Sequence, residues 1–313
     1  MASLSRLNKL ALISLGAVGG GFVYYKINSV SDENERKFNA YNSWTTNYTP
    51  SVRWDKNWDH RSPESLVKKS SLQQAPEDDN KYNEKLDLVR SRAVRHLILI
   101  RHGQYNVDGR GDQERTLTKL GRIQADLTGR RLAAMNIKWD ELVRSTMTRA
   151  QETAEIITQH LDKELMIKNC QLIEEGAPIP PEPPVGHWRP EKSQFFQDSA
   201  RIEAAFRKYF HRAPPDQKDD SYTILVCHAN VIRFFVCKAL QFPPEGWLRM
   251  SLNHGSITWI SINPNGSVIL RSLGDTGHMD PFYFVFGKRL EKASYGRWCQ
   301  KFGETVNLEI KNT

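Results

Sequence analysis

His-Leu-Ile-Leu-Ile-Arg-His-Gly, at residues 96–103, is matched later in the chain by Tyr-Thr-Ile-Leu-Val-Cys-His-Ala, at residues 222–229. Each stretch contains an apolar run rich in branched side chains, which is typical of a strand buried on both faces of a parallel sheet. Each run ends in a histidine, His102 and His228. Because chemistry in such sheets collects beyond the carboxyl ends of the strands, the two runs predict one crevice that holds both histidines.

Strand-like and helix-like patterns alternate from about residue 94 to residue 275, which is typical of an α/β domain. Thr118 is a suitable N-cap for the first helix, and an Asn-Pro-Asn-Gly turn joins the last two strands as a hairpin. We predict a three-layer α/β sandwich, with a mostly parallel sheet and helices on both faces. Helices are expected at residues 118–135, 146–160, 199–210 and 231–240, and further strands at residues 141–143, 256–262 and 267–273.

The charge balance favours anionic partners. The 313 residues carry 44 Lys and Arg against 36 Asp and Glu, a formal net charge of +8. No basic cluster interleaved with aromatic residues stands out, so we expect no nucleic-acid partner. The four cysteines are scattered without the spacing of a zinc site or a disulfide scaffold, so we predict no zinc site and no disulfide framework.

An apolar run at residues 10–25 lies between Arg6, Lys9 and Lys26, and is just long enough for a membrane span. A cleaved signal peptide is the alternative, but no small-x-small cleavage site follows. We predict that residues 1–27 are an uncleaved anchor or targeting segment. The lack of acidic residues before Asp32 fits mitochondrial targeting.

Residues 28–93 are polar and predict a linker. Within it, residues 54–59 read Trp-Asp-Lys-Asn-Trp-Asp, and exposed tryptophan is typical of interface anchors. We predict that this motif joins copies of the chain; the alternative is that it folds back onto the catalytic domain. The motif's candidate contact residues are Trp54, Asp55, Trp58 and Asp59. The sequence of the C-terminal tail, residues 276–313, does not indicate a role for it.

Phosphoryl transfer through a histidine needs a neutral nitrogen as nucleophile, arginine forks for the phosphoryl oxygens and an acid for the leaving group. The sequence offers His102 as the nucleophile, with Arg101 beside it and Arg149 at a helix start. Either Glu174 or Glu175, before Gly176, can supply the acid.

Four segments, in this order, resemble the motifs of the phosphoglycerate-mutase-like histidine phosphatase superfamily. They are Leu-Ile-Arg-His-Gly at 99–103, Thr-Leu-Thr-Lys-Leu-Gly-Arg-Ile-Gln-Ala at 116–125, Ser-Thr-Met-Thr-Arg-Ala-Gln-Glu-Thr at 145–153 and Val-Cys-His-Ala-Asn-Val-Ile-Arg at 226–233. The resemblance covers about residues 94–275. It implies a phosphohistidine intermediate formed without metal or cofactor, with His102, His228 and the acid as catalytic residues and Arg101 and Arg149 on the phosphate. We favour Glu175 over Glu174 as the acid.

The anchor, the motif at 54–59 and the segment at 242–249 are similar to a mitochondrial serine/threonine protein phosphatase of this superfamily. That similarity implies a membrane-anchored homo-oligomer in mitochondria, acting on phosphoserine and phosphothreonine proteins. Three alternatives stay open: a phosphomutase, a small-molecule phosphatase, and an oligomeric membrane scaffold that retains the site.

Overall fold

The computed structural model describes residues 52–67, 76–186 and 189–283, and only the backbone of residues 76–78. The chain divides into two compact units, Met1–Trp54 and Asp55–Thr313, and every element described below lies in the second. The predicted anchor at residues 1–27 and most of the tail at 276–313 fall outside the described residues. None of the described helices is long and apolar enough to cross a membrane.

The centre of the fold is a six-stranded mixed sheet with the order β3-β2-β4-β1-β5-β6. The first four strands in this order are parallel, and the β5–β6 hairpin adds two antiparallel strands beside β1. The hairpin was predicted, but its pairing with β1 was not. The strands are β1 (Arg95–Arg101), β2 (Glu141–Ser145), β3 (Met166–Cys170), β4 (Ser221–Cys227), β5 (Ile257–Ile262) and β6 (Val268–Asp275).

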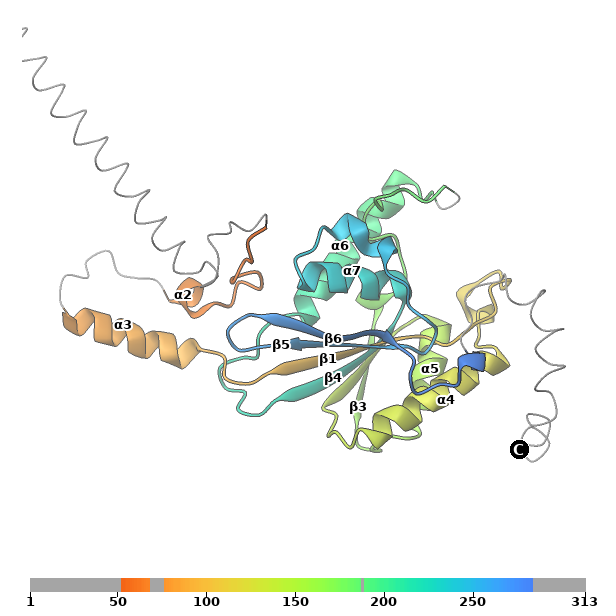
Figure 1. The fold of residues 1–313 in the computed structure, drawn as a ribbon, viewed down its shortest axis with the longest axis horizontal. Coiled ribbons are helices and arrows are strands. Elements are labelled where there is room, and N and C mark those ends of the chain that lie inside the picture. The colour runs from red at the N-terminus through yellow and green to blue at the C-terminus, as the bar shows by residue number, and fades with distance from the viewer. Residues whose placement is uncertain (1–51, 68–75, 187–188, 284–313) are drawn as a thin grey trace, which may run out of the picture. The chain divides into compact units, whose positions relative to one another are not determined.

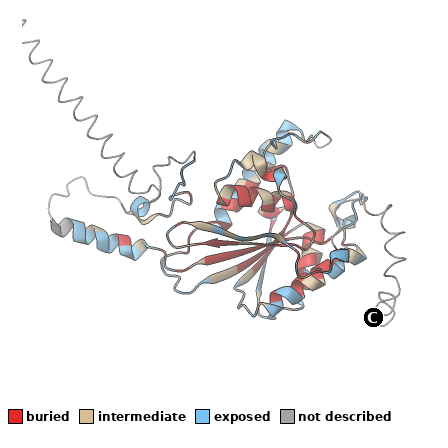
Figure 2. Ribbon diagram, viewed as in Figure 1, coloured by how far each residue is buried: buried red, intermediate tan, exposed pale blue. Residues whose placement is uncertain are grey.

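Helices cover both faces of the sheet, with α6 and α7 on one side and α4 and α5 on the other (Figure 1). Alternate residues of β1 point to opposite faces of the sheet. Leu97 and Leu99 pack in the core with α6 and α7, whereas Ile98 and Ile100 pack in the core with α4 and α5. Buried residues accordingly concentrate on the central strands and the facing sides of these helices (Figure 2). This confirms the predicted α/β fold with helices on both faces.

The helices begin and end close to the predicted residues, with one exception. They are α4 (Lys119–Ala134), α5 (Thr148–Thr158), α6 (Lys192–Tyr209) and α7 (Ala229–Ala239), with short 3-10 turns at Asp112–Glu114, Gln171–Ile173, Pro244–Arg249 and Pro281–Tyr283. The Thr118 side chain accepts from the backbone N of Gly121, as the cap prediction requires. α6 begins at Lys192, before the predicted start at residue 199. The sequence did not indicate its first turns, because they are mostly exposed and carry little apolar periodicity.

The region predicted as a linker contains two helices, α2 (Pro63–Leu66) and α3 (Pro76–Val89). The second half of α3 contains Glu84, Lys85, Leu86 and Leu88, residue types that favour helix formation by propensity even where no broad apolar face is present. The edge strand β3 was also not predicted, since four of its five residues are exposed and it lacks an apolar run.

Candidate active site

The structure brings His102 and His228 together, as the two strand-like runs predict. β1 and β4 are parallel neighbours with Arg101 opposite Cys227, and the backbone N of His102 donates to the Cys227 carbonyl at 3.0 Å. Both histidines follow the last residue of their strand, so their ring centroids lie 5.0 Å apart.

His102 is buried and held in one tautomer. Its Nδ1 lies 2.8 Å from the Gly103 carbonyl oxygen, which can only accept, so Nδ1 carries the proton. Nε2 is then the atom with a free lone pair, and Nε of Arg149 donates to it at 3.3 Å. Burial, followed by the charges of His228 and Arg101, holds the pKa of His102 well below its usual 6.5. The imidazole is therefore neutral and nucleophilic at neutral pH.

The glycine after His102 lets two helices approach this histidine. A Cβ on Gly103 would lie 2.4 Å from the carbonyl oxygen of Gly121, in the first turn of α4. The backbone N of Gly103 donates to Oγ1 of Thr153 on α5 at 3.0 Å. Any larger residue would push α4 away from the end of β1.

Arg101 ends β1 and turns its guanidinium into the crevice. Nη1 donates to the Leu252 carbonyl at 2.5 Å, and Nη2 lies 3.0 Å from Nε2 of His254. Burial lowers the pKa of Arg101 to about 10, and the nearby Glu175 carboxyl opposes that shift. The side chain remains a cation at neutral pH.

Arg149 lies in the first turn of α5 and is buried. Besides its contact with His102, its Nη1 meets Oδ1 of Asp112 at 3.4 Å, and its guanidinium carbon lies 4.6 Å from the centre of the Tyr105 ring. Asp112 also accepts from the backbone N and hydroxyl of Thr148, which fixes the carboxylate at the helix start. The arginine is thus restrained on the side away from His102.

His228 is the N-cap residue of α7 and is fully buried. Its Nε2 lies 2.8 Å from Oγ of Ser145, while its Nδ1 has no hydrogen-bond partner among the described residues. Burial, and then the charges of Arg149 and Arg101, hold its pKa well below 6.5. A neutral imidazole with one uncommitted nitrogen therefore faces a site that contains two cations.

Of the two candidate acids, Glu175 has the environment of a proton donor. Burial raises its pKa, although Arg101 and Arg149 act to lower it. Its Oε1 accepts from the backbone N of Asn230 and of Gly176, both at 3.3 Å. Glu174 instead accepts a hydrogen bond from the Thr146 hydroxyl.

The sequence reasoning missed His254, which precedes β5. Its ring centroid lies 5.6 Å from that of His102. Burial, then the charges of Arg101 and Arg149, lower the pKa of His254 to about 3. Arginine only donates hydrogen bonds, so Nε2 of His254 accepts and the proton lies on Nδ1, which has no partner among the described residues. Only the pairing of β5 with β1 brings this residue to the crevice.

The Trp-Asp motif is partly used within its own chain. Trp58 is 8% exposed, packs 5.9 Å from the Phe206 ring and donates through Nε1 to the Gly266 carbonyl at 2.8 Å. Asp59 forms a buried ion pair with Arg212 at 2.9 Å. Trp58 and Asp59 thus follow the alternative interpretation of the sequence, in which the motif folds back. Trp54, 37% exposed, and Asp55 remain at the surface.

Within the described part of the chain, no group of three or more His, Cys, Asp or Glu side chains is arranged to hold a metal ion. The polar groups of the crevice are two guanidinium groups and neutral histidines around the Glu175 carboxyl group, with Asp112 paired to Arg149. Such a set is suited to an anion with several oxygens, and phosphate matches the fork geometry of two guanidinium groups.

The chain belongs to the histidine phosphatase superfamily (branch 1), whose family model matches residues 97–175 and 182–275. It is 53% identical over 279 residues to a protein of Drosophila pseudoobscura pseudoobscura named serine/threonine-protein phosphatase Pgam5, mitochondrial, covering 87% of this chain and 94% of that protein. The protein of the same name from Drosophila yakuba is 51% identical over 267 residues, covering 84% of this chain and 91% of the relative. The predicted superfamily is confirmed.

Among solved structures, a phosphoglycerate mutase from Plasmodium falciparum matches 58% of this chain and 92% of its own length. Its sequence identity is 33% and its TM-score is 0.42.

Proposed function

We propose that this chain is a mitochondrial serine/threonine protein phosphatase that works through a phosphohistidine on His102. The observation that carries the proposal is the hydrogen bond from Nδ1 of His102 to the Gly103 carbonyl, which leaves Nε2 unprotonated beside Arg149. The names of relatives about half identical to this chain support the substrate class and the compartment.

In the first step, Nε2 of His102 attacks phosphorus and the ester oxygen departs. Arg101 and Arg149 neutralise the phosphoryl oxygens, and Nδ1 of His228 donates to one of them while the Ser145 hydroxyl donates to Nε2. Preorganised donors of this kind need little reorganisation during the reaction. Glu175, whose pKa is raised by burial, gives its proton to the leaving serine or threonine oxygen.

In the second step, the Glu175 carboxylate takes a proton from water, the water oxygen bonds to phosphorus, and the phosphorus–nitrogen bond breaks. Inorganic phosphate leaves, while His102 is again neutral and Glu175 again protonated. His254 assists both steps, because it accepts from Arg101 and offers its Nδ1 proton to the phosphoryl group.

The rival function is a phosphomutase, which would return the phosphoryl group to a second hydroxyl. The test is to incubate the full chain in detergent with phosphoserine and phosphothreonine peptides, and separately with phosphoglycerate. Phosphate release from the peptides alone supports the protein phosphatase. Interconversion of phosphoglycerate isomers without phosphate release would establish the mutase, and inactivity on every substrate would favour the scaffold.

We also propose that residues 1–27 anchor the enzyme in a mitochondrial membrane and that it forms homo-oligomers. The exposed Trp54 and Asp55 support an intermolecular contact, whereas Trp58 and Asp59 stabilise the fold from which that contact is made. Trp54→Ala should therefore lower the mass measured by light scattering without lowering the melting temperature, and Trp58→Ala should lower the melting temperature. An unchanged mass for Trp54→Ala would exclude this contact.

A further inference from the structure

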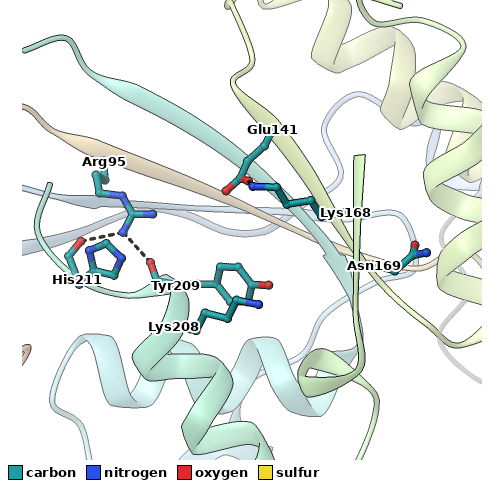
Figure 3. A pocket seen from close by; sticks show the side chains of 7 residues that line it. All are labelled: Arg95, Glu141, Lys168, Asn169, Lys208, Tyr209 and His211. Atoms are coloured by element: carbon teal, nitrogen blue, oxygen red, sulfur yellow. Dashed lines mark hydrogen bonds and ion pairs between the residues drawn. The ribbon is translucent and has the colours of Figure 1, made fainter. Parts of the chain in front are cut away.

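A cavity of about 470 Å³ lies on the α6 side of the sheet, between the amino ends of β1 and β2, the middle of β3 and the end of α6. Its lining includes Arg95 and Glu141, the first residues of β1 and β2, together with Lys168, Lys208 and His211 (Figure 3). β1 has seven residues, so its length separates Arg95 from His102 by roughly 20 Å. The cavity therefore has no residue in common with the candidate active site.

Arg95 is the deepest cation of this cavity, at 8% exposure. Its Nη1 donates to the carbonyl oxygens of Tyr209 at 2.8 Å and His211 at 3.0 Å, and both acceptors are uncharged. Among the described residues, its other guanidinium nitrogens make no hydrogen bond and no carboxylate lies within 4.0 Å of them. A nitrogen of the fork points away from the two carbonyls into the hollow (Figure 3).

The charges around Arg95 do not balance it. Glu141 is the one acidic residue in the lining, and its Oε2 pairs with Nζ of Lys168 at 2.6 Å. Nζ of Lys208 lies 5.2 Å from the centre of the Tyr209 ring and has no ion pair within the cavity lining. Burial, and next the charge of Arg95, lower the pKa of His211 to about 4, so this ring adds no charge at neutral pH. Three cations thus face one carboxylate.

A buried guanidinium is costly unless an anion or several acceptors compensate it. Arg95 remains charged at neutral pH, since burial lowers its pKa only to about 10. Its uncommitted nitrogens and the ammonium of Lys208 supply donors from two sides of an open cavity. The fork geometry of arginine matches tetrahedral oxyanions, and lysine adds a point charge.

We propose that this cavity is a second anion site, which binds a phosphate group through Arg95 and Lys208, with Lys168 adding positive charge. The phosphate group is either inorganic phosphate or part of a small ester whose remainder fits in the cavity. The inference does not depend on the proposed phosphatase activity, because the two sites have no residue in common.

The test is isothermal titration of the full chain in detergent, using His102→Ala to prevent turnover. Inorganic phosphate should bind at two independent sites. Lys168→Met with Lys208→Met should weaken one of them about tenfold or more, since two charges next to the ligand are lost. The same pair of changes in otherwise wild-type enzyme should leave turnover unaltered. Arg149→Ala should weaken the other site. Lys85→Met with Lys192→Met is the matched control, because both lysines are exposed and belong to α3 and the start of α6.

A parallel titration with glycerol phosphate distinguishes the two sources of the phosphate group. Equal affinities at the site of Lys208 would indicate inorganic phosphate, and tighter binding of glycerol phosphate would indicate an ester. A single site in the parent protein that disappears with Arg149→Ala, or an isotherm unchanged by the lysine substitutions, would overturn the proposal. Melting temperatures of all variants, followed by circular dichroism, verify that they are folded.

Discussion

β1 carries an arginine at each end, and the two side chains have different surroundings. Arg95, at the amino edge, donates to two backbone carbonyls beside lysines. Arg101, at the carboxyl edge, donates to one carbonyl and to His254, near Glu175. Burial lowers the pKa of each to about 10.

The difference lies in what accompanies each arginine. At the carboxyl edge, burial and the arginines lower the pKa values of the histidines, so these rings are neutral, and burial raises the pKa of the Glu175 carboxyl group. At the amino edge the accompanying side chains are mainly fixed charges. The same strand thus presents a site with the components for chemistry at one end and, by our proposal, a site for binding alone at the other.

The variant His102→Ala is the strongest test of the contrast between the two ends of β1. Turnover of a phosphoserine peptide should fall by at least about 10⁴-fold, because the nucleophile is lost. Enzyme quenched in alkali during turnover of a radiolabelled peptide should carry label that acid removes, and the alanine variant should carry none. His211→Asn, at the amino edge, is the control and should retain its rate. Normal turnover by His102→Ala would rule out the phosphohistidine mechanism.

Glu175→Gln should slow turnover by about 10²- to 10⁴-fold, because an alkoxide leaving group needs a proton. With p-nitrophenyl phosphate, whose leaving group scarcely needs one, the loss should be much smaller. Glu174→Gln is the matched control, since its carboxylate is occupied by Thr146. If Glu174→Gln instead shows the leaving-group dependence, Glu174 is the acid.

The pH profile of activity tests the roles assigned to His102 and Glu175. His102 must be neutral, so kcat/KM should rise as pH increases through a histidine pKa below the usual 6.5. Glu175 must be protonated, so activity should fall as pH increases through a carboxyl pKa above its usual 4.5. Glu175→Gln should abolish this alkaline fall. If the fall persists in the variant, it belongs to another group.

Arg149→Ala should cost about 10²- to 10³-fold in kcat, the effect of losing one preorganised donor to the developing charge. Arg130→Ala is a suitable control, because Arg130 is a helix arginine paired with Asp126 but lies on an exposed surface. A loss below about threefold for Arg149→Ala would place this side chain outside the reaction.

The smallest effect is expected for His254→Leu, which removes the acceptor of Arg101 and one proton donor. We expect roughly a tenfold loss of kcat/KM, the scale of one hydrogen bond to a charged group. Inhibition by orthovanadate should weaken in parallel. His254→Asn, which can both accept and donate, should recover part of each. Equal losses in the Leu and Asn variants would show that only the volume of the ring matters.

Much of the site was accessible from local sequence. Short apolar runs specify buried parallel strands, so His102 and His228 could be placed at the same edge before their 5.0 Å separation was known. The Thr118 cap and the turn at residues 263–266 are likewise encoded by a few adjacent residues. The helical parts of residues 63–89 and the edge strand β3 were not predicted, because neither shows a broad apolar pattern.

The sequence alone determined the fold class and the superfamily and nominated Arg101, His102, Arg149 and His228 as candidate site residues, because each depends on neighbours in the chain. Only the tertiary structure decided the rest. The pairing of β5 with β1 places His254 beside Arg101. The backbone N of Asn230, at the start of α7, donates to Glu175 and not to Glu174, and Phe206 of α6 packs against Trp58. These contacts join residues more than 50 positions apart, and burial there depends on how the layers pack. The pKa values follow from that burial, so they could not be assigned before the fold was known.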